Sequence, residues 1–318
     1  MAGVMVLAEH LHGELAEISF ELVGKGREIA DALGEPLDVV VLGAPGLASE
    51  FGRADRVLAV TNPQLRNYAP VAYREAFAQI VQECQPRLTL VGNTSIGMDV
   101  AAAVSAELGL PLIAYCNGLR IEEGKVVATA QLYGGKALVE AMPAADRCVV
   151  AVLAGSFPAD AGRGSGSSKI EERELAGVAS DGIRFRRLIE PEAGDIDITK
   201  QDILVSVGRG IQSHDNLEIV QELADALGGA LCASRPIVDN GWLPKSRQVG
   251  KSGLTVKPKL YFMVGISGAP EHLEGMRNAG CIIAVNTDPK APIFEAADYG
   301  VVADLFDVVP TLIERLKG

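Results

Sequence analysis

The sequence predicts an α/β protein of two domains: an N-terminal domain with a mostly parallel sheet and a C-terminal domain with a doubly wound parallel sheet. Three observations lead to this fold class. The 318 residues exceed the usual size of a single domain. Apolar residues make up 48% of the chain, which is enough for packed cores. Short apolar runs alternate with longer segments that have apolar residues at helical spacing, as strands and helices do in α/β proteins.

The first part of the chain shows this alternation most regularly. The segments, in order, are 4–8, 15–33, 37–42, 57–60, 72–84, 88–91, 98–108 and 112–116. Asn93, Thr94 and Ser95 stand between a strand and the helix expected to begin near Met98. Serine and threonine favour that place because they cap the free N–H groups of a helix. We predict a cap here, and the alternatives are a contact with a partner or a remnant nucleotide site.

From Leu119 the helical spacing disappears, and we expect strands and hairpins that complete the first domain. They cover residues 120–121, 125–132, 136–142 and 147–153. The next segment, 155–168, is rich in Gly, Ser and Ala and predicts an exposed loop. Residues 171–192 are charged and are expected to be extended, with an edge strand at 183–188. We place the domain boundary near Gly194, which gives domains of residues 1–193 and 194–318.

The second domain is predicted to contain five strands that alternate with helices. The strands are 203–207, 230–232, 259–264, 281–285 and 299–302, and the helices are 216–227, 292–297 and 308–316. A Gly-Arg-Gly turn at 208–210 follows the first strand, although Ser213 replaces the third glycine of a dinucleotide fingerprint. In doubly wound sheets, ligands bind at the carboxyl ends of the strands.

Charge and composition exclude several classes of protein. A formal net charge of −12 opposes nonspecific nucleic-acid binding, which needs clustered basic charge. The five cysteines lack a C-x-x-C pair, so we expect buried thiols and neither disulfides nor a zinc site. The apolar runs are too short for a membrane span. The N-terminus lacks the features of a secretory or transit signal, and we expect a cytoplasmic protein.

Residues 232–288 combine glycine turns with cationic and hydroxyl side chains around two short apolar strands. Glycines have no β-carbon, so their backbone N–H groups can approach a ligand closely. The glycines are Gly250, Gly253, Gly265 and Gly268. The cationic or switchable groups are Arg235, Lys251 and His272, and the hydroxyl donors are Ser234, Ser252 and Ser267. The combination predicts an anionic ligand that is phosphorylated, aromatic, redox-active or a nucleotide.

Two glycine-rich stretches resemble phosphate loops without the required context. Gly250-Lys251-Ser252 matches the end of a P-loop, but Lys245 stands where the first glycine should be and no strand precedes it. The G-R-G-S-G-S-S stretch within 155–168 does not open a helix after a strand. We therefore expect neither to bind a nucleoside triphosphate. The remaining histidines, expected to be surface or capping residues, are His10, His12 and His214.

Residues 202–318 carry a series of motifs in a fixed order and spacing. They read V-G-R-G-I, S-R-P-I-V-D-N-G, Q-V-G-K-S-G, G-I-S-G-A, E-H-L-E-G-M, A-V-N-T-D-P-K-A-P-I-F and A-D-Y-G-V-V-A-D-L-F. In these motifs the chain resembles the α subunit of electron transfer flavoproteins, the FAD-binding half of an αβ heterodimer. In layout the resemblance covers nearly the whole chain. It implies FAD as the cofactor and an electron transfer flavoprotein β subunit as the partner.

The resemblance also implies roles for individual residues. It implies that the Arg235 guanidinium lies over the isoalloxazine ring, that the Ser252 hydroxyl approaches flavin N5 and that His272 lies near the pyrimidine carbonyl. The residues implied to hold the pyrophosphate and ribityl region are Arg209, Ser234, Ser267 and Asn286. The residues implied near the adenosine are Asp304 and Leu305. The other expected cofactor-binding residues are Gln248, Val249, Gly250, Lys251, Gly265, Ile266, Gly268 and Ala269.

The chain departs from many members of that family near the expected flavin. Pro270-Glu271 replaces isoleucine-glutamine, and Lys251 replaces a common glutamine. Ser252 keeps the hydroxyl of the more usual threonine but lacks its methyl group. An added carboxylate and an added ammonium shift a flavin potential in opposite senses, and the sequence leaves open which is closer.

The sequence therefore predicts an electron carrier with no catalytic or metal-binding residues. It would take electrons from an acyl-CoA dehydrogenase-type flavoenzyme, as in fatty acid β-oxidation, and pass them on singly. One alternative is the α subunit of an electron-bifurcating complex, in which the β subunit holds a second FAD that takes hydride from NADH. Another is a nucleotide-binding enzyme, a kinase or dehydrogenase, with a substrate domain at residues 1–190. Such an enzyme would need a general base or a metal cluster, and no constellation of this kind stands out in the sequence.

Overall fold

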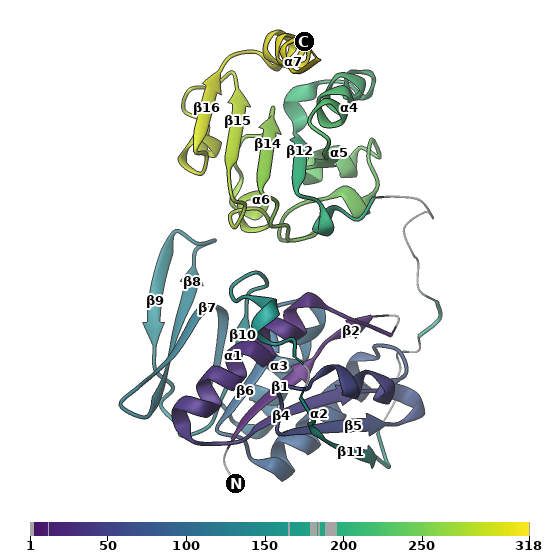
Figure 1. Cartoon of the computed structure of the whole chain (residues 1–318), viewed down its shortest axis with the longest axis vertical. Coiled ribbons are helices and arrows are strands. Elements are labelled where there is room, and N and C mark those ends of the chain that lie inside the picture. The colour runs from purple at the N-terminus through teal and green to yellow at the C-terminus, as the bar shows by residue number, and fades with distance from the viewer. Residues whose placement is uncertain are drawn as a thin grey trace. The chain divides into compact units, whose positions relative to one another are not determined.

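The computed structural model describes residues 3–11, 13–164, 166–178, 183, 185–187 and 196–317. The chain divides into two compact units, residues 1–187 and 188–318, and each is described by itself (Figure 1). The domain boundary expected near Gly194 lies outside the described residues.

The first unit is built on one large sheet with strand order β11-β5-β4-β1-β6-β10-β7-β8-β9. Its strands are β1 (Val4–Ala8), β4 (Leu37–Leu42), β5 (Arg56–Thr61), β6 (Leu88–Gly92), β7 (Leu112–Glu122), β8 (Lys125–Leu132), β9 (Ala137–Ala141), β10 (Cys148–Val152) and β11 (Lys169–Glu174). Every pairing from β11 to β7 is parallel, and only β8 and β9 add antiparallel pairings. The predicted mostly parallel α/β domain is therefore confirmed.

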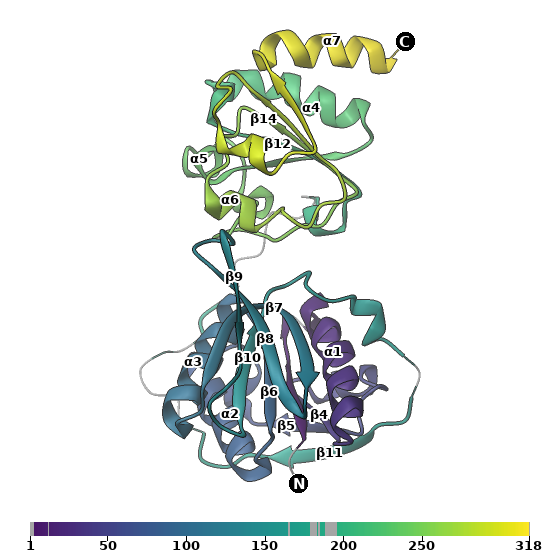
Figure 2. The ribbon, with the colours of Figure 1, turned by 90° about the vertical axis from the view of Figure 1, so that its left-hand side faces the viewer.

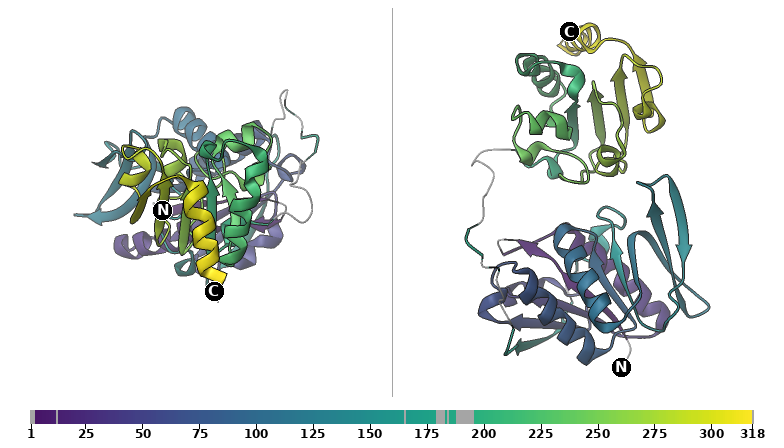
Figure 3. Two further views of the ribbon diagram at one scale, coloured as in Figure 1. Left: turned by 90° about the horizontal axis from the view of Figure 1, so that it is seen from above. Right: turned by 180° about the vertical axis from the view of Figure 1, so that it is seen from behind.

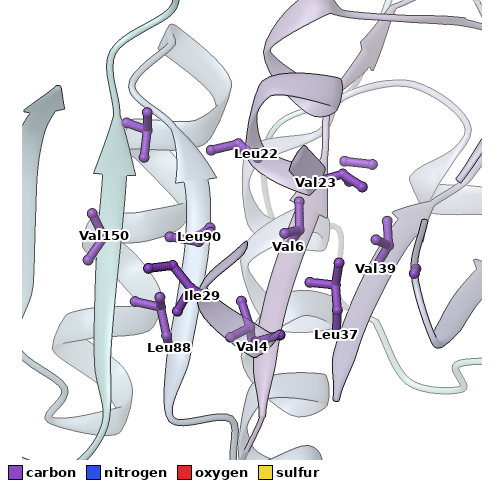
Figure 4. Packing of buried hydrophobic residues seen from close by; sticks show 14 of the residues in the cluster. Val4, Val6, Leu22, Val23, Ile29, Leu37, Val39, Leu88, Leu90 and Val150 are labelled. Carbon is purple, nitrogen blue, oxygen red and sulfur yellow. The ribbon is translucent and has the colours of Figure 1, made fainter. Parts of the chain in front are cut away.

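Helices cover both faces of this sheet, α1 (Glu17–Leu33) on one and α2 (Pro70–Cys84) with α3 (Ser95–Leu108) on the other (Figure 2). Because successive strand residues point to opposite faces, Val4 and Val6 of β1 pack against α1 while Met5 packs on the far side. Figure 4 shows Val4 and Val6 beside Leu22 and Ile29 of α1. Burial on both faces explains why these strands read as continuous apolar runs.

Three details of the first unit differ from expectation. The strands expected at 112–116 and 120–121 are one strand, β7, whose register shifts between Cys116 and Gly118. The helix expected from residue 15 begins at Glu17, because β3 (Glu14–Leu15) pairs with β2 (His10–Leu11) in a short hairpin.

The third difference concerns the edge of the sheet. Ile183 and residues 185–187 form no strand, and the rest of the expected edge strand at 183–188 lies outside the described residues. The edge is β11 instead, which pairs in parallel with β5. Glu171 of β11 lies 3.5 Å from the guanidinium of Arg56 on β5, so part of this pairing rests on charge and not on apolar burial.

The second unit has a five-stranded parallel sheet in the order β13-β12-β14-β15-β16. The strands are β12 (Ile203–Val207), β13 (Ala230–Ala233), β14 (Leu260–Val264), β15 (Ile282–Asn286) and β16 (Tyr299–Val302). The helices are α4 (Leu217–Ala226), α5 (Arg235–Asp239), α6 (Pro270–Glu274) and α7 (Leu305–Lys317). The predicted doubly wound sheet is confirmed, with its reversal of strand order between β12 and β14.

The two faces of the second sheet are covered by different elements. The helices α4 and α7 lie side by side on one face (Figure 3, left) and share an apolar cluster with α5. Leu273 of α6 and Ile293 pack on the other face. The helix expected at 292–297 is only a 3₁₀ turn, Pro292–Glu295, and α7 begins at Leu305, because Asp304 Oδ1 accepts a hydrogen bond from the backbone N–H of Phe306.

The turns after β12 and β14 touch backbone to backbone. The N–H of Gly208 donates to Val264 O (2.9 Å), and the N–H of Gly210 donates to Gly265 O (3.0 Å). Gly265 has a φ of +62°, and a β-carbon there would lie 2.8 Å from Gly210 Cα. Only glycine allows this contact, which brings the carboxyl ends of the two strands together.

We predict that Gly265→Ala destabilises the second unit by about 2–5 kcal/mol, because the left-handed backbone costs about 1–2 kcal/mol and the clash about 1–3 kcal/mol. Gly241→Ala is the matched control, since Gly241 has a φ of +70° and open space around its β position. Urea unfolding of the full chain, followed through its single tryptophan, Trp242, measures both. Equal losses for the two variants would show that the contact with Gly210 adds nothing.

Candidate functional site

A pocket of about 180 Å³ opens at the carboxyl ends of the second sheet. Its lining residues are Gly210, Gln212, Gly265, Val285, Asn286, Thr287, Ala303, Asp304 and Leu305. They follow or end β12, β14, β15 and β16, as expected of a site in a doubly wound sheet. Four of them were predicted from the sequence: Gly265, Asn286, Asp304 and Leu305.

The polar side chains of this pocket are held by the backbone. Asn286 Nδ2 donates to Ile266 O (2.8 Å), and its Oδ1 accepts from the backbone N–H of Asp288 (2.8 Å). The exposed carboxylate of Asp304 caps α7 through the N–H of Phe306 (3.0 Å). Asparagine at a strand end and a capping aspartate therefore stand ready as acceptors and donors for a ligand with hydroxyl groups.

A second part of the site is the turn from Gln248 to Gly253. The backbone N–H of Val249 donates to Ala233 O at the end of β13 (2.9 Å), which ties the turn to the same edge of the sheet. Gly250 O accepts from the N–H of Gly253 (2.8 Å), so Lys251 and Ser252 stand at the tip with exposed side chains. This turn opens no helix, which removes the resemblance of Gly250-Lys251-Ser252 to a P-loop.

His272 lies in the first turn of α6, and its ring lies in the protein interior. The side chain is buried, with Nδ1 3.2 Å from Val249 O and Nε2 3.2 Å from the Tyr261 hydroxyl. Burial lowers the pKa of His272 to about 4, so the ring is neutral at pH 7. Since Val249 O can only accept, Nδ1 carries the hydrogen and Nε2 accepts from Tyr261. The His272 ring therefore contacts the turn from Gln248 to Gly253 through the backbone carbonyl of Val249.

Tyr261 was not among the predicted site residues. It is fully buried in β14, and its hydroxyl lies 2.9 Å from Ser206 Oγ as well as 3.2 Å from His272 Nε2. In the sequence it is one apolar strand residue among others, and no periodicity marks its partner. The gap of eleven residues to His272 closes only when α6 folds back onto the sheet.

The cations of the site are exposed. Arg235 is 67% exposed at the start of α5, where its Nε lies 3.1 Å from Asp239 Oδ2. A surface pair of this kind contributes at most about 1 kcal/mol, so the guanidinium can exchange Asp239 for a ligand at little cost. Arg209 is exposed in the turn after β12. Ser234, by contrast, is buried, with its Oγ donating to Val207 O at 3.4 Å.

Lys251 and Glu271, the two departures noted in the sequence, lie close in the fold. The backbone N–H of Lys251 donates to Glu271 O (2.7 Å), and the Lys251 ammonium lies 3.9 Å from Glu274 Oε2. The Glu274 side chain is mostly buried, whereas the Glu271 side chain is exposed. The carboxylate of Glu274 is therefore a third charge, besides those of Lys251 and Glu271, that can alter the electrostatic potential at a ligand bound here.

The predicted residues as a whole gather at one edge of the second sheet. Arg209 follows β12, Ser234 and Arg235 follow β13, and the segment from Gly265 to Ala269 follows β14. Asn286 ends β15, and the last pair follows β16: Asp304 and Leu305. Sequence reasoning did not assign the other five lining residues to the site, although all but Gln212 lie within motifs that it singled out: Gly210, Gln212, Val285, Thr287 and Ala303.

The corresponding edge of the first unit is closed. Thr94 caps α3, accepting from the N–H of Gly97 (2.9 Å), and donates to the carboxylate of Glu9 (2.5 Å). Burial raises the pKa of Glu9. The cavity beside these residues is only about 10 Å³, room for about one water molecule. The predicted cap is confirmed, and this volume leaves no space for the alternative nucleotide site.

Other candidate groups fall outside the site. His10 Nε2 contacts Leu42 O (2.7 Å), exposed His214 packs edge-on to Trp242, and His12 lies outside the described residues. The cysteines are free thiols, buried or half-buried. Among the residues that the structure describes, no three His, Cys, Asp or Glu side chains gather to hold a metal ion. Within the same ranges, no helix is both long and apolar enough to cross a membrane.

Comparisons with known proteins give the family. Residues 4–178 match the model of the electron transfer flavoprotein domain, and residues 197–277 match that of the electron transfer flavoprotein FAD-binding domain. The chain is 38% identical to the electron transfer flavoprotein subunit alpha of Thermoanaerobacterium thermosaccharolyticum, over 99% of this chain and 97% of that protein.

The chain belongs to the α-subunit family of electron transfer flavoproteins. Two further relatives carry other names. Protein FixB of Azotobacter vinelandii is 36% identical over 99% of this chain and 91% of its own length. Subunit LctC of the lactate dehydrogenase (NAD(+),ferredoxin) of Acetobacterium woodii is 32% identical over 99% of this chain and 77% of its own length.

Family membership confirms the main functional prediction. The α subunit binds FAD through its second unit, carries electrons and has a β subunit as its partner. Membership of this family replaces the alternative prediction, a nucleotide-binding kinase or dehydrogenase. The residues at the carboxyl edge fit such a cofactor, because the pocket presents Asp304, Asn286 and Thr287 for the hydroxyl groups of a dinucleotide.

We predict that the α subunit loses about 2 kcal/mol of unfolding free energy between pH 7 and pH 5 through His272. The pKa of His272 is about 4 when folded and about 6.5 when unfolded, so the unfolded chain takes up the proton first as the pH falls. The stability is complete above pH 6.5 and declines toward pH 4. Urea unfolding at both pH values measures it.

His272→Gln should remove this pH-dependent part, while His214→Gln, at an exposed histidine of the same unit, should keep it. If wild type and His272→Gln lose the same free energy between pH 7 and pH 5, the histidine is not buried in its neutral form.

Proposed function

We propose that FAD is held along the carboxyl edge of the second sheet by the residues predicted from the sequence. The adenosine end would be held by Asp304 and Leu305, and the isoalloxazine end by Arg235 and Ser252, with His272 supporting the turn of Ser252 through Val249. The pyrophosphate and ribityl region would be held by Arg209, Ser234, Ser267 and Asn286. The observation that carries the proposal is the convergence of all strand-end loops on one edge, with a pocket at its Asn286 and Asp304 end. The loop of residues 266–269 after β14 would supply backbone N–H groups between these ends.

Bound FAD supplies the ability to accept and release electrons. The chain's own residues then set how readily it does so. The exposed Arg235 guanidinium favours added negative charge, since its pair with Asp239 is a weak surface contact. The neutral, buried ring of His272 holds Val249 and thereby the turn that presents Ser252.

We further propose that the electrons come from an acyl-CoA dehydrogenase-type flavoenzyme and leave singly to a downstream acceptor, so that the subunit itself transforms no substrate. The proposal is supported by the gathering of the predicted cofactor-binding residues at one edge of the second sheet. The resemblance noted from the motifs of residues 202–318 supports this donor class. A carrier of this kind needs only one flavin per heterodimer.

A second candidate function is favoured by one relative. LctC is named as a subunit of a lactate dehydrogenase that uses NAD(+) and ferredoxin, and it aligns with 99% of this chain. The alternative is therefore the α subunit of an electron-bifurcating complex, with a second FAD in the β subunit. The ratio of FAD to purified αβ heterodimer separates them: one supports the simple carrier, and two supports bifurcation.

We predict that Arg235→Ala lowers the potential for adding the first electron to the heterodimer's FAD by roughly 65–130 mV. A charge-assisted interaction contributes about 1.5–3 kcal/mol, and a one-electron couple shifts by about 59 mV for each tenfold change. Arg235→Lys should restore only part, because an ammonium lacks the planar guanidinium. Spectroelectrochemical titration measures the shift.

Arg315→Ala is the matched control, since it also removes an exposed cation from the second unit. Arg315 lies ten residues from the start of α7, about 15 Å along the helix and beyond the Debye length of about 8 Å. A potential for Arg235→Ala within about 20 mV of wild type, on the same one-electron scale, would remove Arg235 from the flavin.

We also predict that Asp304→Ala weakens FAD binding by about 1.5–3 kcal/mol and leaves the potential of the remaining flavin nearly unchanged. Its carboxylate lines the pocket assigned to the adenosine end, away from the redox ring. Equilibrium titration of the apo heterodimer with FAD gives the affinity. A large shift in potential with unchanged affinity would place Asp304 at the other end of the cofactor.

A further inference from the structure

We propose that Gln248 is a positioning residue that aims the hydroxyl hydrogen of Ser252 at the bound flavin. The proposal rests on the proposed function, in which Ser252 meets the isoalloxazine end of FAD. The carrying observation is a side-chain contact across the turn: Gln248 Nε2 donates to Ser252 Oγ at 2.9 Å.

The Gln248 side chain is fixed in place beneath the turn. It is 4% exposed, whereas the Ser252 side chain is exposed at the tip. The backbone of Gln248 is bonded on both sides, its N–H to Lys245 O (3.1 Å) and its carbonyl to the N–H of Leu254 (2.8 Å). A β-carbon on Gly253 would lie 2.3 Å from Gln248 O and 3.0 Å from its Cγ. The backbone of Gly253 therefore packs directly against Gln248.

One donated hydrogen bond decides the direction of the Ser252 hydroxyl. A hydroxyl has one hydrogen and two lone pairs. When the Gln248 amide N–H uses one lone pair, the hydroxyl hydrogen cannot point at that amide and is turned outward from the turn. Serine has no second substituent on Cβ, so its side chain would otherwise rotate among three staggered positions.

The consequence for the cofactor is a hydrogen-bond donor of fixed direction. A donor that is already aimed stabilises added electron density on an acceptor atom without reorganising when the charge arrives. Gln248 would thus act through Ser252 and would not need to touch the flavin. This separates its role from that of Arg235, which acts through charge.

The test uses the αβ heterodimer with FAD and three α-subunit changes: Gln248→Met, Ser252→Ala and the two together. Methionine has nearly the length of glutamine and no N–H donor. We expect Ser252→Ala and Gln248→Met each to lower the equilibrium constant for one-electron reduction of the bound FAD about tenfold. This lowers its one-electron potential by about 59 mV. The double variant should show the same shift as Ser252→Ala alone, because both changes remove one donor.

Two further variants control for side effects. Gln221→Met removes an amide that bonds Asp225 on the surface of α4 and should leave the potential unchanged. Gln248→Glu offers only acceptors, so it should draw the Ser252 hydrogen inward and lower the potential more in the wild-type background than in Ser252→Ala. The FAD content of each heterodimer shows that it is folded and loaded, and either Gln248 variant suffices if the other fails this check.

The outcomes separate this inference from the proposed function. If Ser252→Ala shifts the potential but the Gln248 variants do not, or if their shifts are undiminished in the Ser252→Ala background, Gln248 does not position the hydroxyl and the inference fails alone. If Ser252→Ala leaves the potential unchanged, Ser252 is not at the flavin, and the inference fails together with the placement of the isoalloxazine end.

Discussion

The backbone contact between the turns after β12 and β14 is the constraint on which the carboxyl edge of the second unit depends. The N–H of Gly210 donates to Gly265 O, and no β-carbon fits at either position. Because the contact needs glycine, the two central strands end side by side without side chains between them. Asn286 extends the link to β15 through Ile266 O, so three strand ends form one bonded rim. A ligand of dinucleotide length can then contact loops from several neighbouring strands at once, which a single strand could not offer.

The first unit shows that the fold class alone does not make a cofactor site. It too has a parallel sheet whose strand order reverses, between β1 and β6, and a helix N-terminus beside that point. At that point the Glu9 carboxylate accepts a hydrogen bond from the Thr94 hydroxyl at the start of α3, and the cavity beside these residues has a volume of about 10 Å³. A half-buried carboxylate therefore stands where an anionic ligand would have to bind. The difference between the two units lies in their loop residues and not in their sheets.

Much of the fold could be predicted because the central strands are buried on both faces and read as unbroken apolar runs, as β1 does. The prediction failed where pairing does not depend on apolar burial. The sequence of β11, Lys-Ile-Glu-Glu-Arg-Glu, has no strand signal, since ion pairs such as Glu171 with Arg56 help to hold it. In β7 the register shifts between Cys116 and Gly118, and the sequence prediction divided this strand into two. In the site, motif resemblance supplied the residue list, but the contacts of Tyr261 with His272 and of Gln248 with Ser252 leave no periodic signal because they depend on how loops fold back.

The most direct test of this account is amide hydrogen exchange of the αβ heterodimer with and without FAD, resolved to short peptides of the α subunit. The account predicts that FAD slows exchange in the strand-end loops of the second unit, residues 208–213, 248–253, 265–269, 286–288 and 303–306. It also predicts no change at residues 92–97 of the first unit, where Glu9 closes the edge of the sheet. Protection at 92–97 with none in the second unit's loops would place FAD elsewhere and contradict the account.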